Sequence, residues 1–159
     1  MGKRREGREA AVQFLFQNDL STKNPRSRTS AKPATEDADE TSAEPLNHLL
    51  ERFWELRPAP AKTREFGTQL IYGVLENKEA IDERIKKFAA NYELNRIAAV
   101  DRNILRVAIY EMLFNNDVPP VVSINEAIEI AKRFGSEDSG RFVNGILDKI
   151  KAEVPRAPR

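Results

Sequence analysis

Apolar residues recur at helical spacing along most of the chain. Such runs occupy residues 9–20, 46–56, 63–76, 81–89, 100–114, 123–134 and 142–150. Each run places apolar side chains three or four positions apart, which is the spacing of one helix face. No stretch alternates apolar and polar residues over the length of a strand. The pattern predicts an all-α protein of about seven helices, and the short loops favour antiparallel neighbours.

The run from 100 to 114 is apolar on nearly every side, so we expect it to be the buried central helix. Two polar residues at the start of the next run, Ser123 and Glu126, have the spacing of a capping box. Gly135 follows that run and is placed for a left-handed C-cap. These signals predict two well-delimited helices in the C-terminal part of the chain.

Gly140 and Gly145 interrupt the last predicted helix, and an interior glycine costs a helix roughly 1 kcal/mol against alanine. This indicates a surface that backbone or a ligand approaches closely. Phe142 lies between them and is open to two interpretations. It is either a core residue or an aromatic at the edge of the apolar stripe that stacks an unpaired base, with Arg141 and Asn144 beside it. Periodicity by itself favours the core.

The segment 21–45 has no Val, Ile, Leu, Met or aromatic residue. It cannot bury enough apolar area to offset its ordering entropy, so we predict a disordered insertion. Its function is either that of a solvated linker or that of a regulatory or partner-binding segment. The predicted organisation is therefore a basic arm and first helix over 1–20, the insertion, a helical bundle over 46–152, and a flexible tail over 153–159.

Composition excludes several kinds of site. The charge is balanced, with 26 Lys and Arg against 25 Asp and Glu, so attraction to nucleic acid must come from local patches. The absence of cysteine excludes disulfides and thiolate metal sites and fits a cytoplasmic protein. His48 is the only histidine, and no catalytic or nucleotide-binding motif is present. We expect no catalytic site, no metal, no cofactor and no membrane span.

Lys3, Arg4, Arg5 and Arg8 place four cations just before the first apolar run. They form either a solvated terminus or an arm that contacts phosphate, because guanidinium groups bind phosphate bidentately and stay charged. Four contacts to single-stranded RNA would give a slope of log affinity against log salt of roughly −3.

Three segments together closely resemble the NusB family of transcription antitermination factors: RREGREAAVQFLFQ, DRNILRVAIYEM and DVPPVVSINEAIEIAKRFGSEDSGRFVNGILDKI. The resemblance covers the first helix and most of 65–150, and leaves the tract 25–45 outside. It implies an all-helical bundle of two subdomains. It also implies binding to the boxA element of ribosomal RNA leader transcripts, together with NusE, a small-subunit ribosomal protein. The pair would join a complex on RNA polymerase that suppresses Rho-dependent termination.

The resemblance also implies residue roles. RNA contacts carry over to the basic start and to the motif EDS--FVNG, with Arg141 beside it, which gives Lys3, Arg4, Arg5, Arg8, Asp138, Ser139, Arg141, Phe142 and Asn144. It thereby favours a base-stacking role for Phe142. Contacts to NusE carry over to Phe16 and Asp101, where the family commonly has Tyr and Glu. Phe16 lacks the tyrosine hydroxyl, so the partner surface is supported less directly than the RNA surface.

Two alternatives remain at this stage. NusB-like bundles also occur fused to a ribosomal RNA cytosine methyltransferase domain, but this chain shows no second domain and no Gly-rich cofactor loop. The other alternative is a helical module that binds only protein. Some members of the family self-associate, and the sequence leaves open whether this chain forms a homodimer.

Overall fold

The computed structural model describes residues 2–22, 45–89, 93–115 and 117–154, and within these ranges every regular element is a helix. The elements are α1 (Gly2–Thr22), α4 (Leu46–Leu56), α5 (Ala61–Glu76), α6 (Lys78–Phe88), the short 3-10 helix η1 (Leu94–Arg96), α7 (Ala99–Phe114), α8 (Pro120–Phe134) and α9 (Ser139–Lys151). This confirms the predicted all-α fold.

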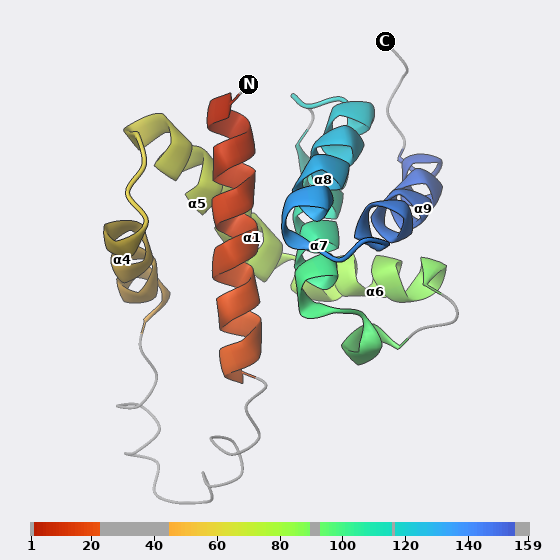
Figure 1. The fold of residues 1–159 in the computed structure, drawn as a ribbon, viewed down its shortest axis with the longest axis horizontal. Coiled ribbons are helices and arrows are strands. Elements are labelled where there is room, and N and C mark those ends of the chain that lie inside the picture. Colours follow the sequence, from red (N-terminus) through yellow and green to blue (C-terminus); the bar gives the residue numbers. More distant parts are fainter. Residues whose placement is uncertain (1, 23–44, 90–92, 116, 155–159) are drawn as a thin grey trace, which may run out of the picture.

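The helices form two groups on either side of α1 (Figure 1). α4 and α5 lie on one side, and α7, α8 and α9 on the other with α6 beneath them. α1 packs against α5 and α7. The apolar residues of both groups nevertheless form one continuous core, in which Phe14 of α1 meets Phe53 of α4 edge to face at 5.4 Å between ring centroids.

α7 is the central helix, as its apolar pattern predicts, and every residue from 101 to 109 is buried. Several of these buried residues are charged, and each of those needs a partner inside the protein. α1 is buried on more of its circumference than one apolar stripe predicts, because it is packed from both sides. Ala10 and Ala11 are fully buried, whereas Leu20, which the stripe places in the core, is 51% exposed.

Prolines set two helix starts. Pro60 precedes α5, and Pro120 occupies the first turn of α8, where a missing N–H costs nothing. The predicted capping box is therefore wrong: α8 begins at Pro120, and Ser123 and Glu126 are buried one turn inside it. The predicted left-handed cap is also wrong, because Gly135 has φ −97°. A Cβ on Gly135 would instead collide with the Ser139 side chain.

Two glycines of α5 permit the close helix contacts expected of small residues. A Cβ on Gly67 would lie 3.1 Å from the carbonyl oxygen of Gly7 in α1. A Cβ on Gly73 would overlap the ring of Tyr110 in α7. α5 therefore approaches α1 and α7 at distances that a larger residue would not allow.

The predicted insertion 21–45 lies almost entirely outside the described residues, although Ser21 and Thr22 still belong to α1. The first two residues of the predicted flexible tail, Glu153 and Val154, contact the helical bundle. Glu153 accepts hydrogen bonds from Lys87 (2.7 Å) and Arg84 (3.1 Å), and Val154 packs against the core. Residues 155–159 lie outside the described part of the chain.

Candidate nucleic-acid interface

The four basic residues near the N-terminus lie on the first two turns of α1 and not on an arm before it. Lys3 and Arg4 are exposed, Arg5 is half-buried and Arg8 is buried. Cations at the N-terminal end of a helix oppose the helix dipole and reduce helix stability. The first turn of α1 has no acidic residue to compensate. This arrangement favours binding of an anion over stability of the helix.

Arg8 forms a buried bidentate ion pair with Glu111 of α7. Its Nε and Nη2 donate to the two carboxylate oxygens at 2.8 and 2.9 Å, and both side chains are at most 5% exposed. The Ser123 hydroxyl donates to the same carboxylate at 3.4 Å. Arg8, which the sequence analysis includes among the RNA contacts, thus joins α1 to α7 in this structure.

Arg5 forms a second bidentate pair, with Glu126 of α8, at 2.8 and 2.9 Å. Here the arginine side chain is 43% exposed and the glutamate 11%. Arg8 also reaches Glu126, at 3.7 Å. The hydrogen bond from Arg5 and the charges of Arg5 and Arg8 outweigh the effect of burial and lower the pKa of Glu126. The same pairing raises the pKa of Arg5, so both groups remain charged at neutral pH.

Lys3 and Arg4 have no carboxylate partner within the described residues. Arg4 lies over one aromatic ring, that of Phe66 in α5, with 5.3 Å between its guanidinium carbon and the ring centroid. Arg8 lies at the same distance from that ring. A cation–π contact of this kind restrains a guanidinium without neutralising its charge. Arg4 is therefore held at the surface with its charge available.

The residues of the last helix that are predicted to contact RNA differ in their exposure to solvent. Asp138 is the N-cap residue of α9 and is exposed, as are Arg141 and Asn144. Ser139 is only 2% exposed, and its hydroxyl accepts a hydrogen bond from the Ser136 backbone N–H at 2.8 Å. Phe142 is half-buried against the core, so its position combines features of both interpretations.

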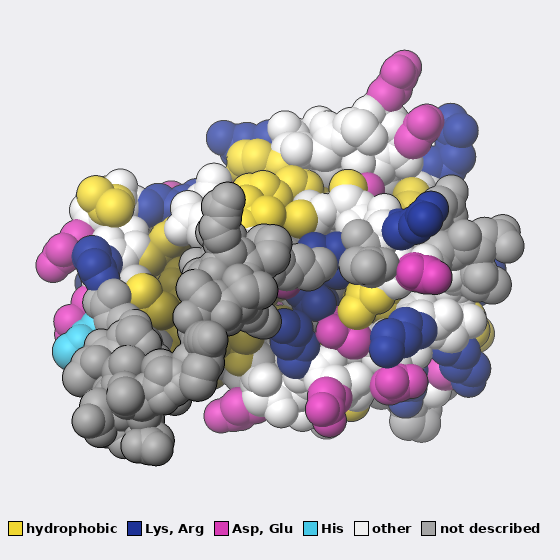
Figure 2. Space-filling view, turned by 90° about the horizontal axis from the view of Figure 1, so that it is seen from below, with side chains coloured by type: hydrophobic (Ala, Val, Ile, Leu, Met, Phe, Trp, Pro, Cys, Tyr) yellow, Lys and Arg dark blue, Asp and Glu magenta, His cyan; other side chains and the backbone are white. Residues whose placement is uncertain are grey.

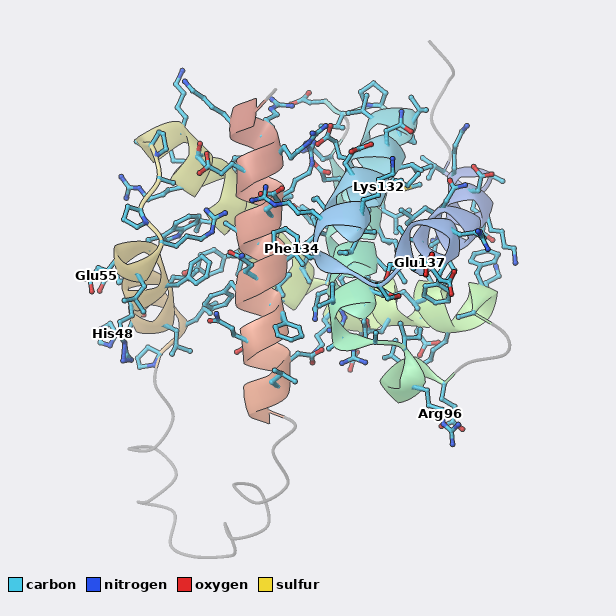
Figure 3. All side chains as sticks on the ribbon, in the orientation of Figure 1. His48, Glu55, Arg96, Lys132, Phe134 and Glu137 are labelled. Carbon is cyan, nitrogen blue, oxygen red and sulfur yellow. The ribbon has the colours of Figure 1, made fainter. Side chains whose placement is uncertain are left out.

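Gly145 faces open space, since an added Cβ would have no neighbour within 4 Å. A Cβ on Gly140 would make an ordinary contact with Ile128 at 3.8 Å. Packing therefore requires neither glycine. The two predicted RNA-binding groups lie on either side of α8, with the N-terminal end of α1 on one side and α9 on the other (Figure 1). Exposed residues of α8, including Lys132, occupy the surface between them (Figure 3).

Phe16 and Asp101, the residues predicted to bind NusE, lie near a groove of about 760 Å³ between α1, α4 and the ends of α7 and α8. Phe16, Leu56 and Phe134 contribute to its lining, and Leu56 is 84% exposed. Phe134 points into the space between α1 and α8 (Figure 3), and hydrophobic side chains gather on the face seen from below (Figure 2). The groove combines an apolar floor with two cations, Arg52 and Arg57.

Asp101 is buried in the first turn of α7, one residue after Val100, which lines the groove. Within the part of the chain that the structure describes, its Oδ1 atom has no hydrogen-bond partner. A buried carboxylate oxygen without a partner carries a desolvation cost that a donor from another molecule would remove.

Other features of the described residues point to no further chemistry. No group of three or more His, Cys, Asp or Glu side chains there is arranged to hold a metal ion. Among the same residues, no helix is long and apolar enough to cross a membrane. His48 is exposed on α4, far from α8 and α9 (Figure 3).

Sequence reasoning missed the two acidic partners of the arginines. It assigned Glu126 to a helix cap and did not single out Glu111. A signal for Glu111 was present, because a charged residue inside an otherwise apolar central helix is almost never fully buried without a partner. The sequence could not say which cation would reach it.

The fold and these surfaces define an all-helical protein with exposed cations at the N-terminal end of α1 and an apolar groove beside α4. The NusB family model matches residues 5–152. A transcription antitermination protein NusB from Desulfotalea psychrophila is 46% identical over 151 residues, covering 95% of this chain and 96% of the relative. The one from Bacillus licheniformis is 44% identical over 152 residues, covering 96% and 98%. The chain belongs to the NusB family.

Solved structures agree with this assignment. NusB of T. maritima has a TM-score of 0.76 and 39% identity, covering 96% of this chain and 93% of that one. A structure of the antitermination factors NusB and NusE in complex with dsRNA has a TM-score of 0.74 and 23% identity, covering 96% and 98%. The second comparison supports the fold alone.

Proposed function

We propose that this protein is a transcription antitermination factor that binds the boxA element of ribosomal RNA leader transcripts together with NusE. In this role it acts in the cytoplasm, within a complex on RNA polymerase that reads through Rho-dependent termination, and performs no catalysis. The observation that carries the proposal is the pair of exposed cations, Lys3 and Arg4, at the positive end of α1 in a member of the NusB family. Neither has a carboxylate partner among the described residues. Cations at this end of a helix attract phosphate and oppose the helix dipole, so they weaken the helix that carries them.

The two RNA-binding groups have different tasks. Lys3, Arg4 and Arg5 attract the backbone without regard to base sequence, because their partners are phosphates. Asp138, Arg141 and Asn144 lie exposed on α9, where their polar groups can reach base edges, and Phe142 supplies an aromatic edge beside them. Ser139 supports this surface from below by holding the backbone of Ser136. Arg8 contributes by fixing α1 against α7.

NusE is the proposed occupant of the groove that Phe16, Leu56 and Phe134 line. Leu56 is exposed there, whereas Phe16 and Phe134 are half-buried. Large apolar side chains that stay partly open to solvent at a groove are typical of a protein interface. Asp101 follows Val100, which lines this groove, and its Oδ1 atom has no hydrogen-bond partner among the described residues, so it suits a donor from NusE. Phe16 supplies apolar contact without a hydroxyl. NusE bound there would extend the RNA-binding surface beyond the few cations of this chain.

The direct test compares RNA binding by the protein with and without NusE, using boxA RNA and a scrambled RNA of equal length. We expect weak binding by the protein alone and a marked increase for boxA when NusE is present. Equal affinity for the two RNAs in the presence of NusE contradicts sequence-specific binding. Binding of NusE with no increase in RNA affinity would show a module that binds only protein.

A second test uses Gly145→Ala. Because the added methyl group meets no neighbour, the substitution should raise the free energy of unfolding by up to about 1 kcal/mol through helix propensity. If RNA approaches this glycine, the same variant binds boxA more weakly. Gly73→Ala is the control for packing, since its methyl group would overlap Tyr110 and should reduce stability.

A further inference from the structure

The pairing of Arg5 with Glu126 changes the number of cations available to RNA. Of the four basic residues, Arg8 and Arg5 are already neutralised by Glu111 and Glu126, and only Lys3 and Arg4 are without a carboxylate partner in the described part of the chain. Each phosphate neutralised on single-stranded RNA contributes about 0.7 to the salt slope. As long as Arg5 stays paired with Glu126, the two cations without such a partner give this helix end a slope near −1.4, in place of the value near −3 expected from the sequence.

The two neutralised arginines differ in how easily they can leave their partners. Arg8 and Glu111 are both buried, so separating them would strand two charges away from water. Arg5 is 43% exposed, and its guanidinium can turn to solvent. Glu126 would keep the charge of Arg8 within 3.7 Å after Arg5 had left. Arg5 is thus the only one of the pair that can exchange its carboxylate for a phosphate at modest cost.

We propose that Glu126 is a competitor of RNA phosphate for Arg5, and that it lowers the affinity of this protein for RNA. This inference rests on the proposed RNA-binding function and adds its regulation. Carboxylate and phosphate use the same two-donor edge of a guanidinium, so Nε and Nη2 of Arg5 serve one or the other. The competition weakens binding to any RNA phosphate, and so makes binding depend on additional contacts from α9 and from a bound partner.

The test substitution is Glu126→Gln. Glutamine keeps the size of the side chain and one acceptor oxygen for Arg5, but removes the negative charge. Arg8 keeps its bidentate partner Glu111, so the buried cluster stays paired. RNA affinity should rise roughly five-fold at 0.1 M salt, and the slope of log affinity against log salt should steepen by about 0.7. The increase should be equal for boxA and for scrambled RNA, because phosphate carries no sequence information.

Glu83→Gln is the matched control, since it removes one carboxylate charge from α6, where Glu83 pairs with exposed Lys86. It should leave the salt slope unchanged. A second measurement uses the wild-type protein, in which the side-chain Nε–H resonance of Arg5 should shift when RNA saturates the protein. This measurement decides the matter if Glu126→Gln does not fold.

Three outcomes overturn the proposal: weaker RNA binding by Glu126→Gln, an unchanged slope, or an Arg5 resonance that RNA does not move. Weaker binding would show that Glu126 positions Arg5 for RNA. All three are distinct from failure of the proposed function, which would appear as no preference of the wild-type protein and NusE for boxA over scrambled RNA. If the wild-type protein prefers boxA but Glu126→Gln has the same RNA affinity and salt slope as the wild type, only this inference is wrong.

Discussion

Both ends of α1 form ion pairs with the C-terminal group of helices, but α1 supplies charges of opposite sign at its two ends. At the N-terminal end, α1 supplies the cations, and Arg5 and Arg8 meet Glu126 and Glu111. At the C-terminal end it supplies the carboxylate: Asp19 Oδ2 accepts from Arg102 at 2.8 Å and from Arg106 at 3.2 Å. Because α1 and α7 run in opposite directions, the two sets of pairs fix the register between the helices.

The difference between the ends lies in what remains uncompensated. At the C-terminal end Arg106 also binds Asp82 of α6, at 2.9 and 3.0 Å, so two arginines face two aspartates and all are largely buried. At the N-terminal end two arginines face two glutamates, and Lys3 and Arg4 are added at the surface. At the C-terminal end of α1 the charges of the cluster are buried and paired. At the N-terminal end, Lys3 and Arg4 are exposed and have no carboxylate partner among the described residues.

The largest expected effect is at the C-terminal end of α1. Asp19→Ala leaves Arg102 and Arg106 buried with one fewer carboxylate, which typically costs about 3–5 kcal/mol of stability. Urea unfolding measures the loss, and RNA binding by the folded fraction should be unchanged. Glu153→Ala is the control. It removes an exposed carboxylate that pairs with Lys87 of α6, and it should change stability little. A small loss for Asp19→Ala would show that this end is not a structural cluster.

Arg8→Ala and Arg4→Ala should separate structure from binding at the other end. Arg8→Ala leaves Glu111 buried without its main partner and should cost about 3 kcal/mol of stability. Arg4→Ala loses only a contact with Phe66, worth less than about 1 kcal/mol, but should flatten the RNA salt slope by about 0.7. Unfolding curves and salt titrations of both variants check this. A flatter RNA salt slope for Arg8→Ala with unchanged stability would show that Arg8 binds RNA and is not needed for the fold.

Acid should weaken both ends. Burial raises the pKa of Asp19, but the hydrogen bond from Arg102 and the charges of Arg106 and Arg102 outweigh it, and the net pKa lies below the usual 3.8. Glu126 also has a lowered pKa, below its usual 4.5. The unfolded chain then binds more protons, so stability is constant above these usual values and falls as pH decreases below them. Urea midpoints from pH 6 to pH 2 measure the fall, and Glu126→Gln should remove the part that begins nearest pH 4.5.

The smallest effect is expected at Glu9, the residue that follows Arg8 in α1. Glu9 is buried, but Arg133, its partner at 3.1 Å, is 66% exposed. Arg133→Ala should therefore cost at most about 1 kcal/mol, because water can replace the arginine. Thermal unfolding of this variant beside Arg8→Ala shows whether burial of the pair sets its value. Equal losses for the two variants would mean that burial is not the deciding factor.

Much of the fold was predictable because it depends on local pattern. The spacing of apolar residues located the helices, and the apolar run at 100–114 identified the central one. Local signals failed where a side chain had a distant partner: Ser123 and Glu126 have capping-box spacing, yet they bind Glu111 and Arg5. The same limit applied to Lys3, Arg4, Arg5 and Arg8, which are all basic residues in one short stretch but differ in exposure and in their carboxylate partners.

The sequence by itself determined the all-helical class, the central helix and the family. Those properties follow from residue types and from spacing along one chain. The tertiary structure decided which charges are free. Arg8 is paired with Glu111 and Arg5 with Glu126, whereas Lys3 and Arg4 have no carboxylate partner in the part of the chain that the structure describes. The physical reason is that a charge is neutralised by what lies within about 4 Å of it, and those neighbours come from residues more than 100 positions away.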